Sequence, residues 1–260
     1  MVKAVFFDVD GTLVSFQTHK MSDSTLYALH AMREQGIKLI VSTGRHKSQL
    51  FSIQEFEFDG YITLNGQYCF VDDQIIYKNC IPKKDIQTIV QMLKRKPFPC
   101  IFGAQKDLFL NYEDDEVRFI HQSVNISPPP ICPVERALQE DIFQIVPYIH
   151  PEQEKEFMSH LPHCNATRWN PLFIDVVPKG GSKALGIQKM LEYFNLTGAE
   201  TVSFGDGGND VEMVRMTTIG VAMGNGGEDV KQAADYITTS VDEDGIYNAL
   251  VHYNVIPPKK

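Results

Sequence analysis

The stretch AVFFDVDGT, residues 4–12, decides the fold. The apolar run that leads into it, Val2 to Phe7, is short, β-branched and aromatic, and two acidic residues and Gly11 follow this run. Such a run is typical of a buried parallel strand that delivers side chains at its C-terminal end. Ligands in open α/β sheets bind at the C-terminal ends of the strands. We therefore expect Asp8 and Asp10 to lie in a site at the edge of a sheet.

Strands and helices alternate on both sides of this stretch and again near the end of the chain. A helix is expected to begin at Ser22 or Asp23 and to end near Gly36, with buried strands at 37–41 and 61–64. The alternation returns after the middle of the chain, with a helix at 182–194 and strands at 201–204, 219–223 and 236–238. Alternation of this kind favours right-handed βαβ units. We predict an α/β fold with a Rossmann-like parallel-sheet core.

The middle of the chain has a different pattern. Residues 67–77 are expected to form a hairpin around Asp72 and Asp73. Residues 82–178 contain helical stretches and isolated strands, without regular alternation. We interpret this segment as an inserted α+β domain, so that residues 1–81 and 179–260 together form one discontinuous core domain. Pro82 and Pro178 are the candidate hinge points.

The composition narrows the class of protein. The chain has 24 Lys and Arg against 33 Asp and Glu, a net charge of −9, which argues against a nucleic-acid-binding surface. No stretch approaches the roughly 20 apolar residues of a membrane span, and the N-terminus is a poor signal peptide. The five cysteines are scattered, without a C-x-x-C pair, as expected for reduced thiols. We predict a cytoplasmic protein without nucleic-acid or membrane partners, whose oligomeric state the sequence leaves open.

A second acidic motif, GDGGND at residues 205–210, also follows a predicted strand. It is not a dinucleotide-binding fingerprint, because that pattern needs glycine where Asp210 stands. Asp206 and Asp210 are hard oxygen ligands, and carboxylates without accompanying His or Cys favour magnesium over zinc. The alternative is a tight turn that caps a helix.

Two further signals are weak when each is taken alone. Thr43 and Gly44 end the second predicted strand, where a hydroxyl and a free backbone N–H can bind a phosphate. Lys183 stands at the start of a predicted helix, where a cation is unfavourable unless an anion lies nearby. The order of the four motifs, from the D-x-D-G-T stretch to the final G-D-x-x-N-D, is much more specific than any of them.

In this order of motifs the sequence resembles the haloacid dehalogenase superfamily of phosphotransferases. More narrowly, it resembles the Cof-type phosphatases, which carry a large α/β cap inserted after the third core strand. The resemblance runs along the whole chain, through segments 6–13, 42–45, 64–66, 179–183, 205–210, 224–235 and 244–245. The inserted segment 82–178 matches in size and placement only.

The resemblance implies a role for each motif. Asp8 would be the nucleophile that forms an aspartyl phosphate, and Asp10 the general acid and base. Mg²⁺ would be held by Asp8, the backbone carbonyl of Asp10 and Asp206, with support from Asp210. The phosphoryl oxygens would be held by Thr43, Gly44, Lys183 and Asn209.

The substrate is left open at this stage. The resemblance implies a phosphatase acting on a small phosphorylated metabolite: a sugar phosphate, a nucleotide or a cofactor phosphate. A phosphomutase or phosphotransferase would use the same intermediate, and a non-catalytic phosphometabolite-binding protein is the third alternative. The candidates for contact with the organic part of the substrate are Arg45 and His46 beside Thr43, and Arg168, Trp169 and Asp175 in the inserted segment.

Overall fold

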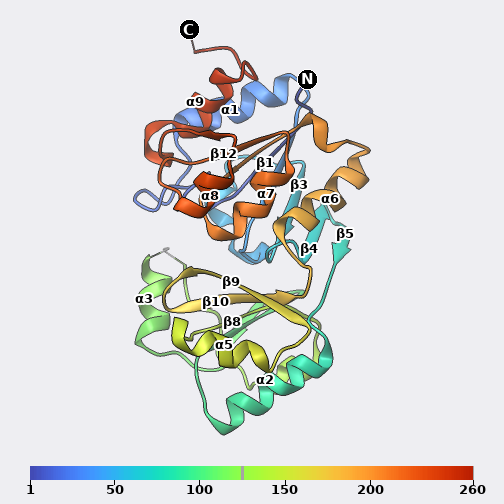
Figure 1. Ribbon diagram of the computed structural model, residues 1–260, viewed down its shortest axis with the longest axis vertical. Coiled ribbons are helices and arrows are strands. Elements are labelled where there is room, and N and C mark those ends of the chain that lie inside the picture. The colour runs from blue at the N-terminus through green and yellow to red at the C-terminus, as the bar shows by residue number, and fades with distance from the viewer. Residues whose placement is uncertain (124–125, 260) are drawn as a thin grey trace.

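The computed structural model describes residues 1–123 and 126–259, apart from the side chain of Trp169. This part of the chain contains two β-sheets, one in a core domain and one in a cap (Figure 1). The core strands are β1 (Ala4–Phe7), β2 (Lys38–Ser42), β3 (Gly60–Thr63), β4 (Tyr68–Val71), β5 (Gln74–Lys78), β11 (Thr201–Gly205), β12 (Ile219–Ala222) and β13 (Tyr236–Ile237).

The core sheet has β1 near its centre, in the order β13-β12-β11-β1-β2-β3-β4-β5. β1 pairs in parallel with β11 on one side and with β2 on the other. The pairing stays parallel from β13 to β3, and only the hairpin of β4 and β5 runs antiparallel. The α/β fold with a parallel core sheet, predicted from the sequence, is confirmed.

Helices cover both faces of this sheet. Helices α1 (Asp23–Glu34) and α9 (Gly245–His252) cover one face, and α6 (Lys183–Phe194), α7 (Val211–Met216) and α8 (Glu228–Ala233) cover the other. Successive side chains of a strand point to opposite faces. Accordingly, Val5 and Phe7 pack in the cluster beneath α1 and α9, and Ala4 and Phe6 pack in the cluster beneath α6. All four are fully buried, because helices cover both faces.

The cap is built on a second, antiparallel sheet, in the order β7-β6-β8-β10-β9. Its strands are β6 (Cys100–Ala104), β7 (Leu108–Leu110), β8 (Ile142–Pro147), β9 (Cys164–Asn170) and β10 (Phe173–Pro178). The strands of this segment form one continuous sheet, as the expected α+β cap requires. The sequence does not show which strands pair, because β6 pairs with β8 across an intervening strand and two helices, a long-range contact that local periodicity does not record.

The cap helices lie on both sides of this sheet. Helices α2 (Lys83–Arg95) and α5 (Pro151–Ser159) pack on the face turned away from the core, in a cluster with Phe102 of β6 and Ile174 of β10. Helix α3 (Asp115–Ser123) packs in a separate cluster with Tyr148 and Phe173. The short α4 (Arg136–Gln139) lies near α2. Within the described residues, no helix is long and apolar enough to cross a membrane.

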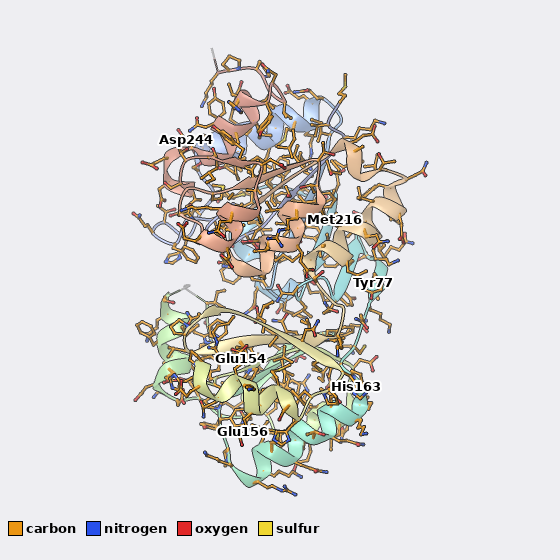
Figure 2. All side chains as sticks on the ribbon, viewed as in Figure 1. Tyr77, Glu154, Glu156, His163, Met216 and Asp244 are labelled. Carbon is orange, nitrogen blue, oxygen red and sulfur yellow. The ribbon has the colours of Figure 1, made fainter. Side chains whose placement is uncertain are left out.

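The chain passes between the two sheets twice, after β5 and after β10. Tyr77 of β5 lies close to this junction, whereas Met216 lies on the core and Glu156 on the cap (Figure 2). Pro82 is the residue before α2, and Pro178 is the last residue of β10. The cap sheet is thereby placed over the carboxyl ends of the core strands.

The turn after β3 packs tightly against the start of α6. Leu64, Asn65 and Gly66 all have positive φ angles, of 52°, 53° and 89°. A Cβ atom on Gly66 would lie 2.0 Å from the carbonyl oxygen of Ser182, a distance that no packing can accommodate. Ser182 caps α6 by accepting a hydrogen bond from Leu185 N–H. The absence of a side chain at Gly66 thus fixes where α6 begins.

We expect Gly66→Ala to destabilise the protein more than Gly36→Ala. Both glycines have positive φ, of 89° and 75°, but a Cβ on Gly36 would meet nothing within 4 Å. Both variants therefore carry the backbone cost, and only Gly66→Ala adds overpacking of about 1–3 kcal/mol. Urea unfolding of the two variants measures the difference. Equal losses would show that the turn and α6 separate without cost.

Candidate active site

Three core strands and one helix bring the predicted residues to one place. Asp8 follows β1, Thr43 follows β2 and Asp206 follows β11, and these three strands are neighbours. The carboxyl ends of parallel strands meet at one edge of a sheet, so the three side chains converge. Lys183, the first residue of α6, enters from the side.

Lys183 joins two carboxylates inside the protein. Its ammonium group lies 2.5 Å from Asp8 Oδ1 and 2.6 Å from Asp210 Oδ1. Lys183 and Asp210 are fully buried, and Asp8 is nearly so. Burial lowers the pKa of Lys183, but the charges of Asp210 and Asp8 more than offset this, so the pKa is raised and the lysine stays charged. The anion that the sequence position of Lys183 required is thus a pair of carboxylates.

Asp210 shapes the loop that carries Asp206. Its Oδ2 accepts the backbone N–H groups of Asp206 at 3.0 Å and Gly207 at 2.9 Å, while its Oδ1 accepts from Lys183. Asp206 in turn accepts a hydrogen bond of 3.1 Å from the hydroxyl of the buried Thr12. Both oxygens of Asp210 are therefore engaged by the protein, and Asp206 is held facing the β1 loop.

The carboxylates of this cluster are unfavourably close to one another. Burial raises the pKa of Asp8 to about 7, with Lys183 opposing and Asp210 and Asp10 adding to the rise. Burial, followed by the charges of Asp8 and Asp210, raises the pKa of Asp206 to about 9. Three carboxylates and one ammonium would carry a net charge of −2 if all were ionised. A divalent cation would offset this charge.

The donor atoms fit such a cation. One oxygen from each of Asp8, Asp206 and Asp210 lies within 4.8 Å of the others. The set consists of hard oxygen donors without His or Cys, which suits Mg²⁺ better than zinc. Both oxygens of Asp210 already accept hydrogen bonds, from Lys183 and from the backbone, so Asp8 and Asp206 are the better placed ligands.

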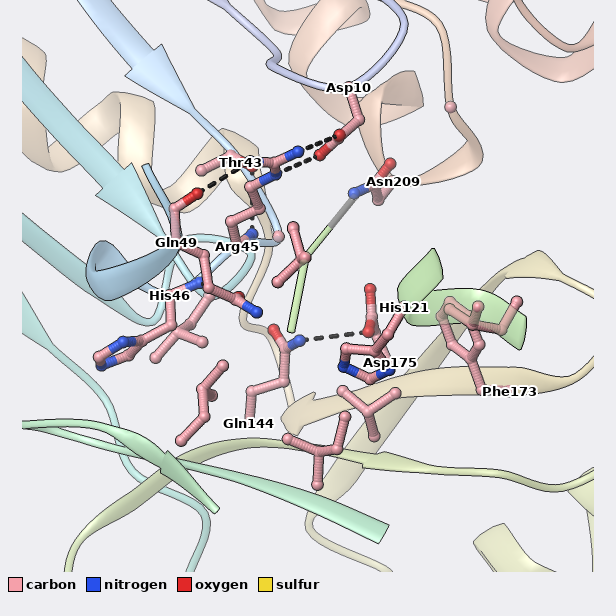
Figure 3. A pocket seen from close by; sticks show the side chains of 18 of the residues that line it. Asp10, Thr43, Arg45, His46, Gln49, His121, Gln144, Phe173, Asp175 and Asn209 are labelled. Carbon is pink, nitrogen blue, oxygen red and sulfur yellow. Dashed lines mark hydrogen bonds and ion pairs between the residues drawn. The ribbon is translucent and has the colours of Figure 1, made fainter. Parts of the chain in front are cut away.

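Asp10 is turned towards Arg45 and away from this cluster. The guanidinium donates to both carboxylate oxygens, Nε at 2.7 Å to Oδ2 and Nη2 at 2.6 Å to Oδ1 (Figure 3). Arg45 is itself held through Nη1 by the carbonyl of Gln49 at 2.8 Å and the hydroxyl of Ser52 at 3.1 Å. Two parallel bonds fix the orientation of the Asp10 carboxyl group.

The predicted phosphate-binding residues lie around these groups. Thr43 is buried, and its hydroxyl accepts the backbone N–H of Arg45 at 3.1 Å. Gly44 lies against the side chain of Asn65, 3.3 Å from a hypothetical Cβ. Asn209 lines the same cavity as Thr43 and Gly44.

A hydrogen-bond network links the core to the cap. Asn65 donates from Nδ2 to Gln144 Oε1 and to Asp175 Oδ2, both at 3.0 Å. It accepts at Oδ1 from Asn209 at 2.9 Å, and Gln144 donates to Asp175 at 3.2 Å. Asn65, Gln144 and Asp175 are buried. The network therefore joins β8 and β10 of the cap to the loop after β11.

The cavity of about 180 Å³ between core and cap contains both kinds of residue. Asp8, Asp10 and Asp206 line its core end, and Gln144 and Asp175 line its cap end. Figure 3 shows Asp10 at one end and Gln144 and Asp175 at the other. The remaining cap wall is largely apolar, formed by Ile101, Leu108, Ile120, Val146, Tyr148 and Phe173. The catalytic candidates thus open into a chamber whose far wall belongs to the cap.

The five candidates for contact with the organic group are placed differently, and Asp175, as described above, lines the cavity. His46 lines the cavity, but its Nε2 lies 3.1 Å from the Ala104 carbonyl, and burial, with Lys47, lowers its pKa to about 4. Arg168 donates to Glu154 and to four backbone carbonyls, so its guanidinium stabilises the end of the cap sheet instead of reaching the cavity. The side chain of Trp169 lies outside the described structure. Arg45 contacts Asp10, as described above.

Sequence reasoning passed over several members of the site. Asn65 carried a usable signal, since an Asn-Gly pair directly after a strand marks a turn at the sheet edge. No sequence signal pointed to Gln144, because an isolated glutamine inside a strand is usually a surface residue. Thr12 belongs to the D-x-D-G-T stretch, but its bond to Asp206 spans 194 residues.

Comparison with known proteins gives consistent matches. Residues 5–250 match the family model of haloacid dehalogenase-like hydrolases. "Putative phosphatase YkrA" of Bacillus subtilis (strain 168) is 31% identical over 251 residues, 95% of this chain and 96% of that protein. The 5-amino-6-(5-phospho-D-ribitylamino)uracil phosphatase YitU of the same organism is 26% identical, covering 96% of each chain. The solved structure of the HAD subclass IIB sugar phosphatase BT4131 has a TM-score of 0.93 and 41% identity, covering 98% of this chain and 100% of that one.

We expect the metal-free protein to lose stability as the pH rises. The pKa of Asp8 is raised from 3.8 to about 7, and that of Asp206 from 3.8 to about 9. At pH values between 3.8 and about 9, these carboxyl groups therefore bind more protons in the folded chain than in the unfolded chain. The free energy of unfolding therefore falls between about pH 6.5 and pH 9; below pH 6.5 the buried histidines His46 and His121, whose pKa values are lowered, oppose the fall. Urea unfolding in EDTA at pH 6.5 and 8.5 measures this fall.

The matched control for this pH effect is Asp206→Asn, which removes the group with the larger shift. Its stability should depend less on pH than that of the unaltered protein. Mg²⁺ should stabilise the unaltered protein more at pH 8.5 than at pH 5.5, because protons compete for its ligands. Equal pH dependence in the two proteins would contradict the assignment.

Proposed function

The chain belongs to the haloacid dehalogenase-like hydrolase family and is a phosphatase of that superfamily, and we propose that it acts with Mg²⁺ through an aspartyl phosphate on Asp8. The observation that carries the proposal is the position of the Asp8 carboxylate. Lys183 holds its Oδ1, whereas within the described residues Oδ2 makes no hydrogen bond, and Asp8 lines the cavity. One oxygen is thus fixed and the other is left to react.

The first half of the reaction transfers the phosphoryl group to the protein. Asp8 Oδ2 attacks phosphorus, a new O–P bond forms, and the bond to the leaving oxygen breaks. Asp10 donates a proton to that oxygen, so that the product leaves as a neutral alcohol. Both oxygens of the ionised Asp10 accept from Arg45; when Asp10 carries the proton that it donates, one of these two bonds remains to orient the carboxyl group.

The second half regenerates the protein. Asp10, now ionised, accepts a proton from water as the water oxygen attacks the phosphorus of the aspartyl phosphate. The O–P bond to Asp8 breaks, and inorganic phosphate is released. One carboxyl group thus serves as acid and then as base, which only an ionisable side chain can do.

The proposed cation site uses Asp8, Asp206 and the backbone carbonyl of Asp10, with Asp210 in support. The cation supplies positive charge that offsets the repulsion between the carboxylates and the phosphate dianion. Lys183, already buried between two carboxylates, adds a fixed positive charge. The phosphoryl oxygens are held by Thr43, Gly44, Lys183 and Asn209.

The proposed substrate is a small phosphorylated metabolite. The relatives suggest the range: BT4131 is described as a sugar phosphatase, and YitU as a phosphatase of a ribitylaminouracil phosphate. In this proposal the core, residues 1–81 and 179–260, binds the phosphate, and the cap, residues 82–178, contacts the organic part. All five cysteines are free thiols, which suits the expected cytoplasmic location.

Replacing Asp8 tests the covalent step. Asp8→Asn should release no phosphate from a panel of phosphometabolites that the unaltered protein hydrolyses in Mg²⁺ but not in EDTA. Acid quenching during turnover should trap phosphate on the unaltered chain and not on the variant. The same assay should follow isomeric products, which would reveal a phosphomutase. Full activity of Asp8→Asn would rule out the mechanism.

Replacing Asp10 and Arg45 tests the proton transfer. Asp10→Asn should lower kcat by about 10²–10⁴, the usual scale of general acid–base catalysis. Arg45→Lys keeps the charge but cannot form both bonds, so kcat should fall by a smaller factor while KM changes little. Arg33→Lys, on an exposed core arginine bound to the Glu57 carbonyl, is the matched control. A rise in KM with kcat unchanged would contradict a positioning role for Arg45.

A further inference from the structure

The cavity has two unlike ends, and the mechanism uses only one of them. Asp8, Asp10 and Asp206 line the end where the phosphate reacts. Gln144 and Asp175 line the other end, where the cap wall is otherwise mainly apolar. A carboxylate in such a wall is costly to bury and is retained where it has a partner or a function. In the proposed reaction the phosphate occupies the core end, and the leaving group of the substrate lies against the cap end.

Asp175 and Gln144 are held in fixed positions. Asp175 is 4% exposed, and its two oxygens accept from Asn65 at 3.0 Å and from Gln144 at 3.2 Å. Asn65 is itself held by Asn209 and by its left-handed backbone, with φ of 53°. Rotation of either cap side chain would break buried hydrogen bonds, so the pair presents one arrangement to a ligand.

The charges around the cavity are mostly negative. Its described lining residues include four aspartates and a single Lys or Arg, Arg45, whose guanidinium is bound to Asp10. His121 also lines the cavity, and burial lowers its pKa despite the Val117 carbonyl, so it is neutral at pH 7. The described cap residues that line the cavity thus offer no cation to a second anionic group.

We propose that Asp175, together with Gln144, selects leaving groups that are neutral and bear hydroxyl groups, and rejects those that carry a second negative charge. Hydroxyls donate to carboxylate and carboxamide oxygens, whereas a carboxylate or phosphate placed there would face Asp175. The volume of about 180 Å³ lies below the roughly 300–1,000 Å³ of sites for drug-sized ligands. A compact polyol or sugar monophosphate therefore fits better than a nucleotide. This inference rests on the proposed phosphatase function.

Matched substrate pairs test the selection on the unaltered protein. Sorbitol 6-phosphate and 6-phosphogluconate differ by one CH₂OH in place of a carboxylate, as do glycerol 3-phosphate and 3-phosphoglycerate. We expect kcat/KM to be at least about tenfold higher for the neutral member of the better pair, the scale of one charge-assisted hydrogen bond. Equal values, or a preference for the anionic member, would overturn the inference.

Variants assign the selection to the residue. Asp175→Asn should lower kcat/KM for the neutral substrate by about 10–100-fold, mainly through KM, and should lower it much less for the anionic one. The ratio between the two substrates should therefore shrink by about tenfold or more. Asp141→Asn, on an exposed cap aspartate 4.0 Å from Lys78, is the matched control and should leave the ratio unchanged. If the folded Asp175→Asn protein keeps the same ratio of kcat/KM between the two substrates, the result contradicts the proposed role of Asp175.

A binding measurement covers the case in which Asp175→Asn does not fold. The Asp8→Asn protein keeps Asp175, and calorimetry with Mg²⁺ should give tighter binding of the neutral member of each pair. Equal binding of both members would overturn the selection even without turnover. Phosphate release without charge preference contradicts this inference alone, whereas no release from any compound contradicts the proposed function.

Discussion

A single buried ammonium group holds this site together. Lys183 lies between Asp8 and Asp210, and without it two carboxylates would face each other away from water. Removing one member of such a buried group leaves an uncompensated charge, at a cost of about 3–5 kcal/mol. The lysine can occupy this place because α6 begins against the turn at Gly66, where a side chain would collide with Ser182. The packing of one glycine therefore determines the electrostatics of the site.

The ammonium does not neutralise the cluster, and this imbalance underlies the proposed chemistry. Burial and mutual repulsion raise the pKa values of Asp8 and Asp206, so the metal-free site holds protons that a cation would displace. The same excess of negative charge suits the proposed cation site. Binding of the proposed cation would relieve the repulsion among these carboxylates.

The cap completes the site through a few polar contacts. Asn65 connects Asn209 of the core with Gln144 and Asp175 of the cap, so the groups proposed to bind phosphate and those proposed to contact the leaving group share one network. His46 adds a second bridge, to the Ala104 carbonyl. Buried networks of this kind permit few alternative arrangements. The position of the cap and the shape of the cavity are therefore coupled.

The sequence by itself determined the core fold and the convergence of the acidic motifs. Neighbouring strand residues such as Val5 and Phe6 point to opposite faces of the sheet and are both apolar, as a parallel sheet covered on both faces requires. Asp8, Thr43 and Asp206 come directly after strands. Tertiary structure alone decided that Asp10 faces Arg45, that Arg168 binds Glu154, and that Gln144 and Asp175 reach the cavity. The reason is the separation of these residues along the sequence. Local periodicity indicates which face of a helix or strand is buried, but the hydrogen bond between Asn65 and Asp175 spans 110 residues and depends on how the two sheets pack.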